Sequence, residues 1–304
     1  MRYLPRLVGA LVVLWGAATL AFLVLKLVPG DPVAIMLGAQ TQASDAVKAR
    51  IREDLGLDRP PFEQYFGYLG RILLLDFGTS YRLQRPVSDV IGAQLPSTLA
   101  LTGAAIVLAL LIALVIAITA RGRVSRAVAS VLELLVISSP GFWTGLLLLT
   151  LFSFQLHWFP VSGGQGLAAL VLPAITLALP IAGLLSQLLR HGLDSANAQP
   201  FVTSVLARGL GPVQLLARHT LRHAALPATT FAAYIVGALL GGAVIVEQLF
   251  GRPGIGRVAL EAITNRDLPV VMALVFLAAA VFVVINLIVD ALYPLLDPRL
   301  RSAR

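Results

Sequence analysis

Six apolar stretches alternate with polar segments along the chain, and each has about 20 residues or more, the length that crosses a hydrocarbon core of about 30 Å as a helix. They cover residues 7–28, 97–120, 128–156, 168–189, 226–247 and 268–292. The third is long enough to tilt or kink, and it contains Pro140 and Gly141. This pattern predicts an all-α membrane protein with six transmembrane helices.

The residues ahead of the first stretch, Met-Arg-Tyr-Leu-Pro-Arg, are similar to the start of a secretory signal peptide. The apolar run behind them is longer than a usual signal core, and no small-residue cleavage site follows it. We therefore interpret residues 1–28 as a retained first transmembrane helix.

Composition agrees with a membrane protein. Hydrophobic residues make up 58% of the chain and charged residues 12%, whereas a soluble domain carries about 25% charged residues. Such a chain cannot cover a water-facing surface, which excludes a soluble globular protein. Because there are no cysteines, disulfides, thiolate metal sites and cysteine nucleophiles are excluded as well.

The net charge of +8 comes almost entirely from arginine. We interpret it as arginine at the cytoplasmic ends of the spans rather than as a nucleic-acid surface. Arginines gather before the first span, between spans two and three, between spans four and five, and after the sixth: Arg2, Arg6, Arg121, Arg123, Arg126, Arg190, Arg208, Arg218, Arg222, Arg299, Arg301 and Arg304. The bias places both termini in the cytoplasm.

Two connecting segments carry structure of their own. Residues 29–96 form an external region in which Ser44 is expected to cap a short helix that ends at Gly56. A second short helix is amphipathic and is expected to lie on the membrane or on the helix bundle. Its apolar residues recur at helical spacing: Phe62, Tyr65, Phe66, Leu69, Ile72 and Leu73.

The cytoplasmic loop 190–225 reads as two helices separated by a break. The first runs from Phe201 to Arg208, Gly209-Leu210-Gly211 interrupts it, and Pro212 opens the second. A mostly uncharged helix in such a loop exposes apolar surface to water unless something covers it. Docking onto a cytoplasmic protein and packing against the span ends are both open alternatives.

Few charges lie inside the spans. Glu133, Glu247 and Asp290 either form a proton or cation relay, or pair with arginine and water near the span ends. We favour the second interpretation because no chain of ionisable groups crosses the mid-plane, which also argues against a proton-coupled transporter.

Two further patterns have alternative explanations. His219 and His223 have metal-ligand spacing, but Arg218 and Arg222 beside them favour a basic helix face, and we expect no metal. A face of small residues in the fifth span is either pore-lining or subunit contact, or internal bundle packing, and the sequence does not separate these. That face consists of Ala233, Gly237 and Gly241.

A phosphate-binding loop needs a lysine directly after a glycine, and neither Lys26 nor Lys48 satisfies this. If ATP drives transport, another polypeptide hydrolyses it.

Motifs along most of the chain resemble the permeases of ATP-binding-cassette importers, in the branch that imports dipeptides, oligopeptides and nickel. The resemblance is carried by the loop segments Phe201–Leu210 and Arg218–Pro227 and by short motifs elsewhere. These motifs are Val28–Pro32, Asp76–Ser80, Gln84–Val87, Leu95–Leu99, Ser139–Trp143, Trp158–Gly163, Val246–Phe250, Pro253–Gly256, Asn265–Pro269, Asn286–Asp290 and Leu296–Arg299.

The resemblance implies a type I importer permease fold with a core over residues 94–293, in the bacterial inner membrane. It implies a second homologous permease, an external solute-binding protein, and two cytoplasmic ATPases that bind ATP and magnesium. These ATPases would dock on the coupling helix, which is here Phe201, Val202, Thr203, Ser204, Val205, Leu206, Ala207, Arg208, Gly209 and Leu210. The family's Glu-Ala-Ala triplet would fall on Thr203, Ser204 and Val205, so the side chains of the docking surface differ from the family pattern.

We therefore predict a permease subunit that forms half of a path for peptides, nickel or metal chelates and catalyses no covalent chemistry. An ion-gradient-driven transporter or channel and a structural membrane scaffold are the alternatives. Uptake without any ATPase would favour the transporter, and a deletion without a solute-dependent phenotype would favour the scaffold.

Overall fold

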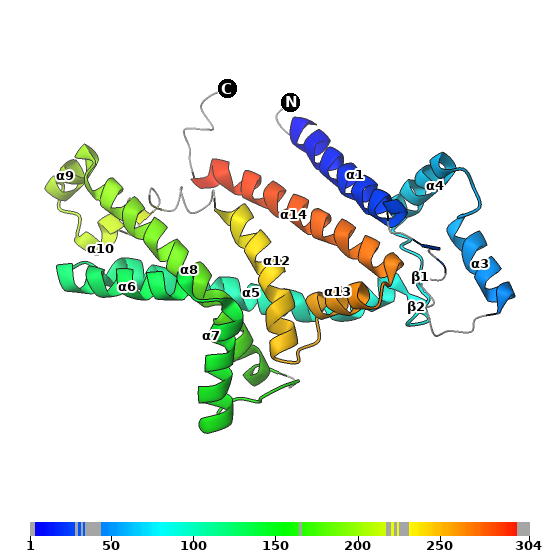
Figure 1. Ribbon diagram of the computed structural model, residues 1–304. Coiled ribbons are helices and arrows are strands. Elements are labelled where there is room, and N and C mark those ends of the chain that lie inside the picture. The colour runs from blue at the N-terminus through cyan, green and yellow to red at the C-terminus, as the bar shows by residue number, and fades with distance from the viewer. Residues whose placement is uncertain are drawn as a thin grey trace. The chain divides into compact units, whose positions relative to one another are not determined.

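The computed structural model describes residues 4–27, 30–31, 33, 44–163, 166–216, 220–221, 224 and 231–296, and these are mostly helical, as predicted. The helices before the bend of the third span are α1 (Leu4–Leu27), α3 (Asp45–Leu55), α4 (Pro61–Leu73), α5 (Val87–Thr119) and α6 (Arg123–Ser138) (Figure 1). After it come α7 (Gly141–Leu148), the π-helical η1 (Leu149–Gln155), α8 (Ala168–Asn197), α9 (Pro200–Ala207), α10 (Pro212–Leu215), α12 (Ala232–Leu249), α13 (Ile255–Thr264) and α14 (Leu268–Leu296).

The chain divides into two compact units. The first consists of Met1–Pro96 and Gly254–Val284, and the second of Ser97–Pro253 and Ile285–Arg304. The division at Pro96 falls inside α5, which begins at Val87, well before the predicted start at residue 97. A proline inside a helix removes one backbone hydrogen bond without always ending the helix, so the sequence placed the boundary too late.

In the first unit, α4 packs against α1 through aromatic side chains. The Thr19 and Tyr65 hydroxyls are 2.7 Å apart, and the Phe22 ring lies 5.4 Å from that of Tyr65 and 5.8 Å from that of Tyr68. Ile72 is buried. Other predicted apolar positions stay exposed, including Phe62 and Leu73. The amphipathic helix is therefore confirmed, and only one side of it rests on α1.

The predicted helix after Ser44 is also present, but its cap differs. Ser44 lies at the N-cap position with extended backbone, yet its side chain makes no capping hydrogen bond. Asp45 in the first turn instead places a carboxylate at the positive end of the helix dipole. The helix ends at Gly56 with φ +62°, the left-handed conformation predicted from a glycine at that place.

Two elements of the first unit were not predicted from the sequence. A hairpin pairs β1 (Thr79–Ser80) with β2 (Arg85–Pro86) in antiparallel register. α13 buries Ala262 in a small core with Val87, Val270 and Ala273. Val258, Ala259 and Ala262 recur at helical spacing, and this was the signal that could have indicated α13.

The second unit is built on close helix packing. Ala105, Ala109 and Ala113 in α5 are fully buried at four-residue spacing, which lets other helices approach its backbone. α6 and α8 lie side by side (Figure 1). A Cβ atom on Gly183 of α8 would lie 2.8 Å from the Val136 side chain of α6, so this position requires glycine.

The third predicted span is not a single helix. α6 and the α7–η1 segment form an angle of 105°. Ser139 between them is extended, with φ −77° and ψ 127°, as the residue before a proline prefers. The sequence indicated a tilt or kink at Pro140, and the bend is much sharper than that.

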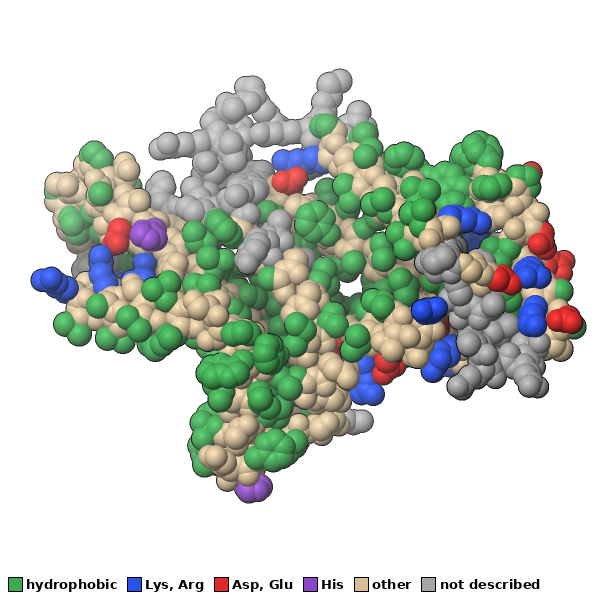
Figure 2. Space-filling view, viewed as in Figure 1, with side chains coloured by type: hydrophobic (Ala, Val, Ile, Leu, Met, Phe, Trp, Pro, Cys, Tyr) green, Lys and Arg blue, Asp and Glu red, His purple; other side chains and the backbone are tan. Residues whose placement is uncertain are grey.

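Among the described residues, four helices are long and apolar enough to cross a membrane, or five if the bent pair counts as one span. The remaining predicted span falls on α12, whose described apolar part, Gly237–Leu249, is shorter. Hydrophobic side chains cover α6 and α7 in Figure 2, whereas acidic and basic groups gather around α3. An uncovered apolar surface of this extent is typical of a protein whose solvent is lipid.

Candidate coupling site

A short helix and a glycine turn follow α8. α9 begins at Pro200, a first-turn position where the missing N–H of proline costs nothing. It ends at Ala207, and Gly209 has φ +80°, which glycine adopts without strain. α10 then opens at Pro212. The structure thus contains the predicted helix, break and second helix.

α9 turns most of its surface outward. Val202 is its buried side chain, whereas Leu206 is 48% exposed and Ala207 and Arg208 are exposed beside it. A helix held by one buried side chain leaves the rest of its surface, which mixes an uncovered leucine with polar groups and a single charge, open to a partner.

The three positions at which the resemblance places a Glu-Ala-Ala triplet lie on α9 as well. Thr203 and Ser204 are exposed and Val205 is half-buried. The absent acidic side chain therefore changes the exposed surface of α9 and leaves its anchoring by Val202 intact. The predicted basic helix that contains His219 and His223 lies outside the described residues.

α8, which leads into α9, is tied to α6 by two ion pairs. Arg126 contacts Asp194 through both guanidinium nitrogens, at 2.9 and 3.3 Å, where both side chains are half exposed. One turn away, Arg190 pairs with Glu133, which is 1% exposed. Pairing of a carboxylate within a span with arginine, the interpretation favoured by the sequence, is confirmed for Glu133.

Ser186 completes the buried pair. Its hydroxyl donates to the second Glu133 oxygen at 2.7 Å, and Arg190 also donates to the Ser130 hydroxyl at 3.2 Å. A buried carboxylate with two donors is satisfied, so the α6–α8 contact has one preferred register. α8 and α6 therefore form a stiff support for α9.

Three other hydrogen bonds connect short motifs that are far apart in the sequence. In the second unit, Thr98 donates to the buried Glu247 at 2.6 Å and Ser97 donates to the Pro253 carbonyl at 2.6 Å. In the first unit, the Ser80 hydroxyl donates to Asp267 at 2.5 Å, and both are buried. These partners were not predicted, because a sequence shows a polar residue in an apolar context but not what it faces.

We expect Thr98→Val to lower the free energy of unfolding by about 1–3 kcal/mol, because the buried Glu247 carboxylate loses a donor. Thr102→Val, one turn along α5, is the matched control. The Thr102 hydroxyl donates only to carbonyls of its own helix, at 2.8 Å to Thr98, so its loss should cost a few tenths of a kcal/mol. Chemical unfolding of the purified chain in detergent measures both, and equal losses would contradict the assigned role.

The small-residue face of α12 does not pack inside the described part of the subunit. A Cβ atom on Gly237 or Gly241 would meet no atom within 4 Å, and the side chain of Ala233 lies outside the described residues. The glycine of α12 that lies close to another helix is Gly242, because a Cβ atom there would lie 2.9 Å from the Leu177 side chain of α8. Among the described residues, no packing contact is seen at Gly237 or Gly241.

Within the described residues, no group of three or more histidine, aspartate and glutamate side chains could hold a metal ion. A polar cavity of about 260 Å³ lies beside the two ion pairs and is lined in part by Arg121, Arg190 and Asn197. Among its described lining residues there is no nucleophile paired with a base, and Arg126 and Arg190 in its wall pair with carboxylates across the α6–α8 contact.

Comparison with known proteins adds the family. Residues 76–302 match the family described as binding-protein-dependent transport system inner membrane component, and residues 1–102 match the N-terminal region described for such membrane components. The chain is 35% identical over 301 residues to the glutathione transport system permease protein GsiC of Salmonella typhimurium, covering 98% of each. It is 35% identical over 309 residues to a putative peptide transport system permease protein of Brucella abortus, again covering 98% of each.

Among solved structures, an amino acid ABC transporter crystallised with histidines superposes with a TM-score of 0.49 at 18% identity. The superposition covers 70% of this chain and 94% of that one.

Proposed function

The chain belongs to the family of binding-protein-dependent transport system inner-membrane components, as a permease subunit of an ATP-driven importer in the bacterial inner membrane, and from this premise we propose that it carries short peptides and is driven through α9. The subunit itself is not an enzyme, and ATP is hydrolysed by a separate subunit of the importer. The family also implies a substrate-binding partner.

Short peptides are the proposed solute because the chain is similar to two relatives over nearly their full lengths, and these relatives are named as permeases for glutathione and for peptides. Glutathione is itself a tripeptide, so one chemical class covers both names. Neither of these names favours nickel or a metal chelate, which the sequence had left open.

The exposed face of α9 is the observation that carries the driving mechanism. One buried side chain, Val202, holds the helix, and Leu206 and its neighbours are uncovered. We assign this face, with Phe201–Leu210, to docking of one ATPase subunit, and expect two ATPases to serve two homologous permeases. Nucleotide-driven closure of the ATPases would then move α9, and with it α8, between two states of the path.

The outward face of α12 is a candidate for contact with the second permease. Small residues allow close helix approach, and a Cβ atom added at Gly237 or Gly241 would meet no atom within 4 Å in the described part of this subunit. We propose that residues 1–28 form the first span and that residues 29–96 form the external region. The permease core then covers residues 94–293 and includes the cytoplasmic coupling loop 190–225.

We expect Gly209→Pro to reduce ATP-driven peptide uptake by at least about tenfold, since a strain of about 1.4 kcal/mol already shifts an equilibrium by that factor. Proline cannot adopt the φ of +80° that ends α9, so the docking surface would be distorted. Uptake of a labelled tripeptide into proteoliposomes with the complete importer measures the effect, and copurification of the ATPase measures docking.

Gly211→Ala is the control, because a Cβ at Gly211 meets no atom within 4 Å. It should transport at the wild-type rate. If Gly209→Pro keeps both ATPase binding and uptake, α9 is not the docking element. Uptake that continues after removal of the ATPase would instead support the ion-gradient-driven alternative.

A further inference from the structure

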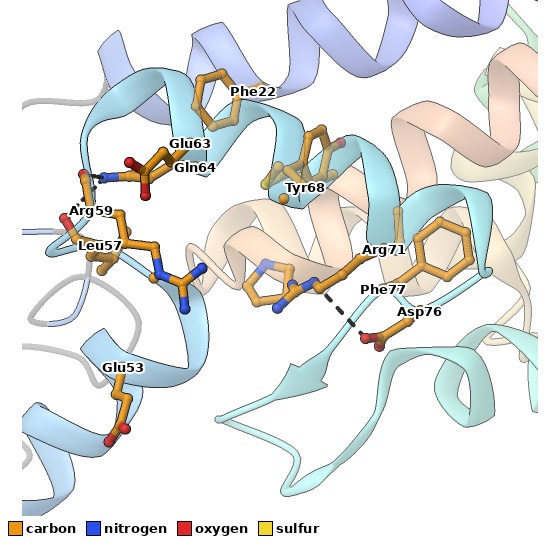
Figure 3. A pocket seen from close by; sticks show the side chains of 15 residues that line it. Phe22, Glu53, Leu57, Arg59, Glu63, Gln64, Tyr68, Arg71, Asp76 and Phe77 are labelled. Carbon is orange, nitrogen blue, oxygen red and sulfur yellow. Dashed lines mark hydrogen bonds and ion pairs between the residues drawn. The ribbon is translucent and has the colours of Figure 1, made fainter.

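A cavity of about 280 Å³ lies beside α4 in the first unit. We call it the α4 pocket. Its walls come from α1, the end of α3, α4 and the start of α14, and Figure 3 shows its side chains. Small-molecule sites usually have about 300–1,000 Å³, so the α4 pocket suits a ligand at the lower end of that range.

Charges of both signs line the α4 pocket. Two guanidinium groups, Arg59 and Arg71, are directed toward the middle of the view in Figure 3, and carboxylates come from Glu53 at the end of α3 and from Glu63 in α4. Arg71 also lies 3.9 Å from the Asp76 carboxylate. With carboxylates at least as numerous as arginines, the pocket favours a ligand that carries both charges over a simple anion such as a lipid phosphate.

The Tyr68 hydroxyl is the second signal of a ligand. It is buried and has no hydrogen-bond partner among the described residues. Burial raises the pKa of Tyr68 to about 12, against the opposing effect of the Arg71 charge. The phenol is therefore protonated at neutral pH and can donate a hydrogen bond, and buried polar groups of this kind usually have a partner.

A glycine keeps the space beside Tyr68 open. Gly67 lines the α4 pocket, and a Cβ added there would meet no atom within 4 Å. Glycine inside a helix is unfavourable compared with alanine, so an open wall at this place has a cost in stability. Phe22 and Phe77 supply apolar walls next to the charged groups.

We propose that the α4 pocket binds a dipeptide or tripeptide with free termini. The peptide carboxylate would accept hydrogen bonds from Tyr68 and Arg71, and the amino group would face Glu53 and Glu63. An apolar side chain would lie against Phe22 and Phe77. This proposal rests on the proposed function, and it adds a solute site on the permease between the external helices α3 and α4 and the span helices α1 and α14.

The test measures direct binding of Ala-Phe by calorimetry to the assembled importer in nanodiscs, without its solute-binding protein. Peptide concentrations of up to about 10 mM are used, because these detect a site whose binding free energy is only a few kcal/mol. We expect saturable binding that is lost when both termini are blocked, as in N-acetyl-Ala-Phe-amide. Gly67→Leu should fill the pocket and weaken binding by at least about tenfold. Tyr68→Phe, which removes only the hydroxyl, should weaken it by about fivefold to tenfold.

Gly70→Leu is the matched control, because Gly70 lies on the same helix with no atom within 4 Å of its Cβ and does not line the pocket. It should bind Ala-Phe within about twofold of wild type, a difference of less than 0.5 kcal/mol. The proposal is overturned if wild type shows no saturable binding, if the blocked peptide binds equally well, or if Gly67→Leu and Gly70→Leu bind alike.

Uptake with the solute-binding protein separates this proposal from the proposed function. Peptide import by the complete importer without direct binding at the α4 pocket overturns the pocket alone. Direct binding without any ATP-driven peptide import overturns the proposed function and leaves the pocket as a peptide site. Should Gly67→Leu fail to assemble, Tyr68→Phe decides the outcome, since it removes a single buried oxygen.

Discussion

Arg190→Met should lower the free energy of unfolding by about 3–5 kcal/mol, because it leaves the Glu133 carboxylate buried without its charge partner. Glu133 is 1% exposed and faces α8 from α6, where Arg190 is its charge partner. Ser186 would remain as a donor at 2.7 Å, but one hydroxyl does not neutralise a buried charge. Chemical unfolding of the purified chain in detergent measures the change.

Arg126→Met is the matched control for that result. It makes the same substitution at the same helix pair, but Arg126 and Asp194 are each 49% exposed, and exposed ion pairs contribute about 0–1 kcal/mol. A second variant tests the cause: Glu133→Leu in the Arg190→Met background should recover most of the loss, because no unpaired charge is left. If both arginine variants lose the same stability, or the double variant recovers none, the buried pair does not have the role assigned to it.

Gly192→Leu should also destabilise the chain strongly, by about 3 kcal/mol or more, through overpacking. A Cβ at Gly192 of α8 would lie 2.7 Å from the Ala224 Cα atom and 2.9 Å from its carbonyl oxygen. Backbone atoms cannot rotate out of the way as a side chain can, so α8 and the segment at Ala224 would have to separate. Unfolding of the purified chain and copurification of the ATPase should both be affected.

Gly103→Leu is the control for Gly192→Leu. Gly103 lies in α5, and a Cβ there meets no atom within 4 Å, so leucine should be tolerated and can gain helix propensity of up to about 1 kcal/mol. Equal stability of the two variants would mean that the close approach of α8 to Ala224 is not required for the fold.

Hydrophobic pattern alone located the helices that carry the fold. The apolar stretches predicted at 7–28, 168–189 and 268–292 fall on α1, α8 and α14, because a membrane-spanning helix must satisfy its own backbone and face lipid with apolar side chains. The local signals at Gly56 and Gly209 were equally direct. Each lies at a helix end with positive φ, which glycine adopts without strain.

Short elements and bends were not determined by that pattern. The hairpin at Thr79–Ser80 is too short for a periodic signal. The sequence predicted a tilt or kink at Pro140, but the 105° bend there depends on what the two halves pack against. α5 passes through Pro96, although proline is also a common helix boundary.

The class of this protein, its apolar helices and the glycine break after α9 could all be predicted, since they follow from composition and local backbone preference. The partners of the buried polar groups and the glycines in close contact could be identified only from the folded chain. Arg190 meets Glu133, Ser80 meets Asp267, and Gly192 rather than Gly237 approaches another backbone. This is because burial and contact depend on residues far away in the chain, and the local sequence around a position does not indicate which residues these are.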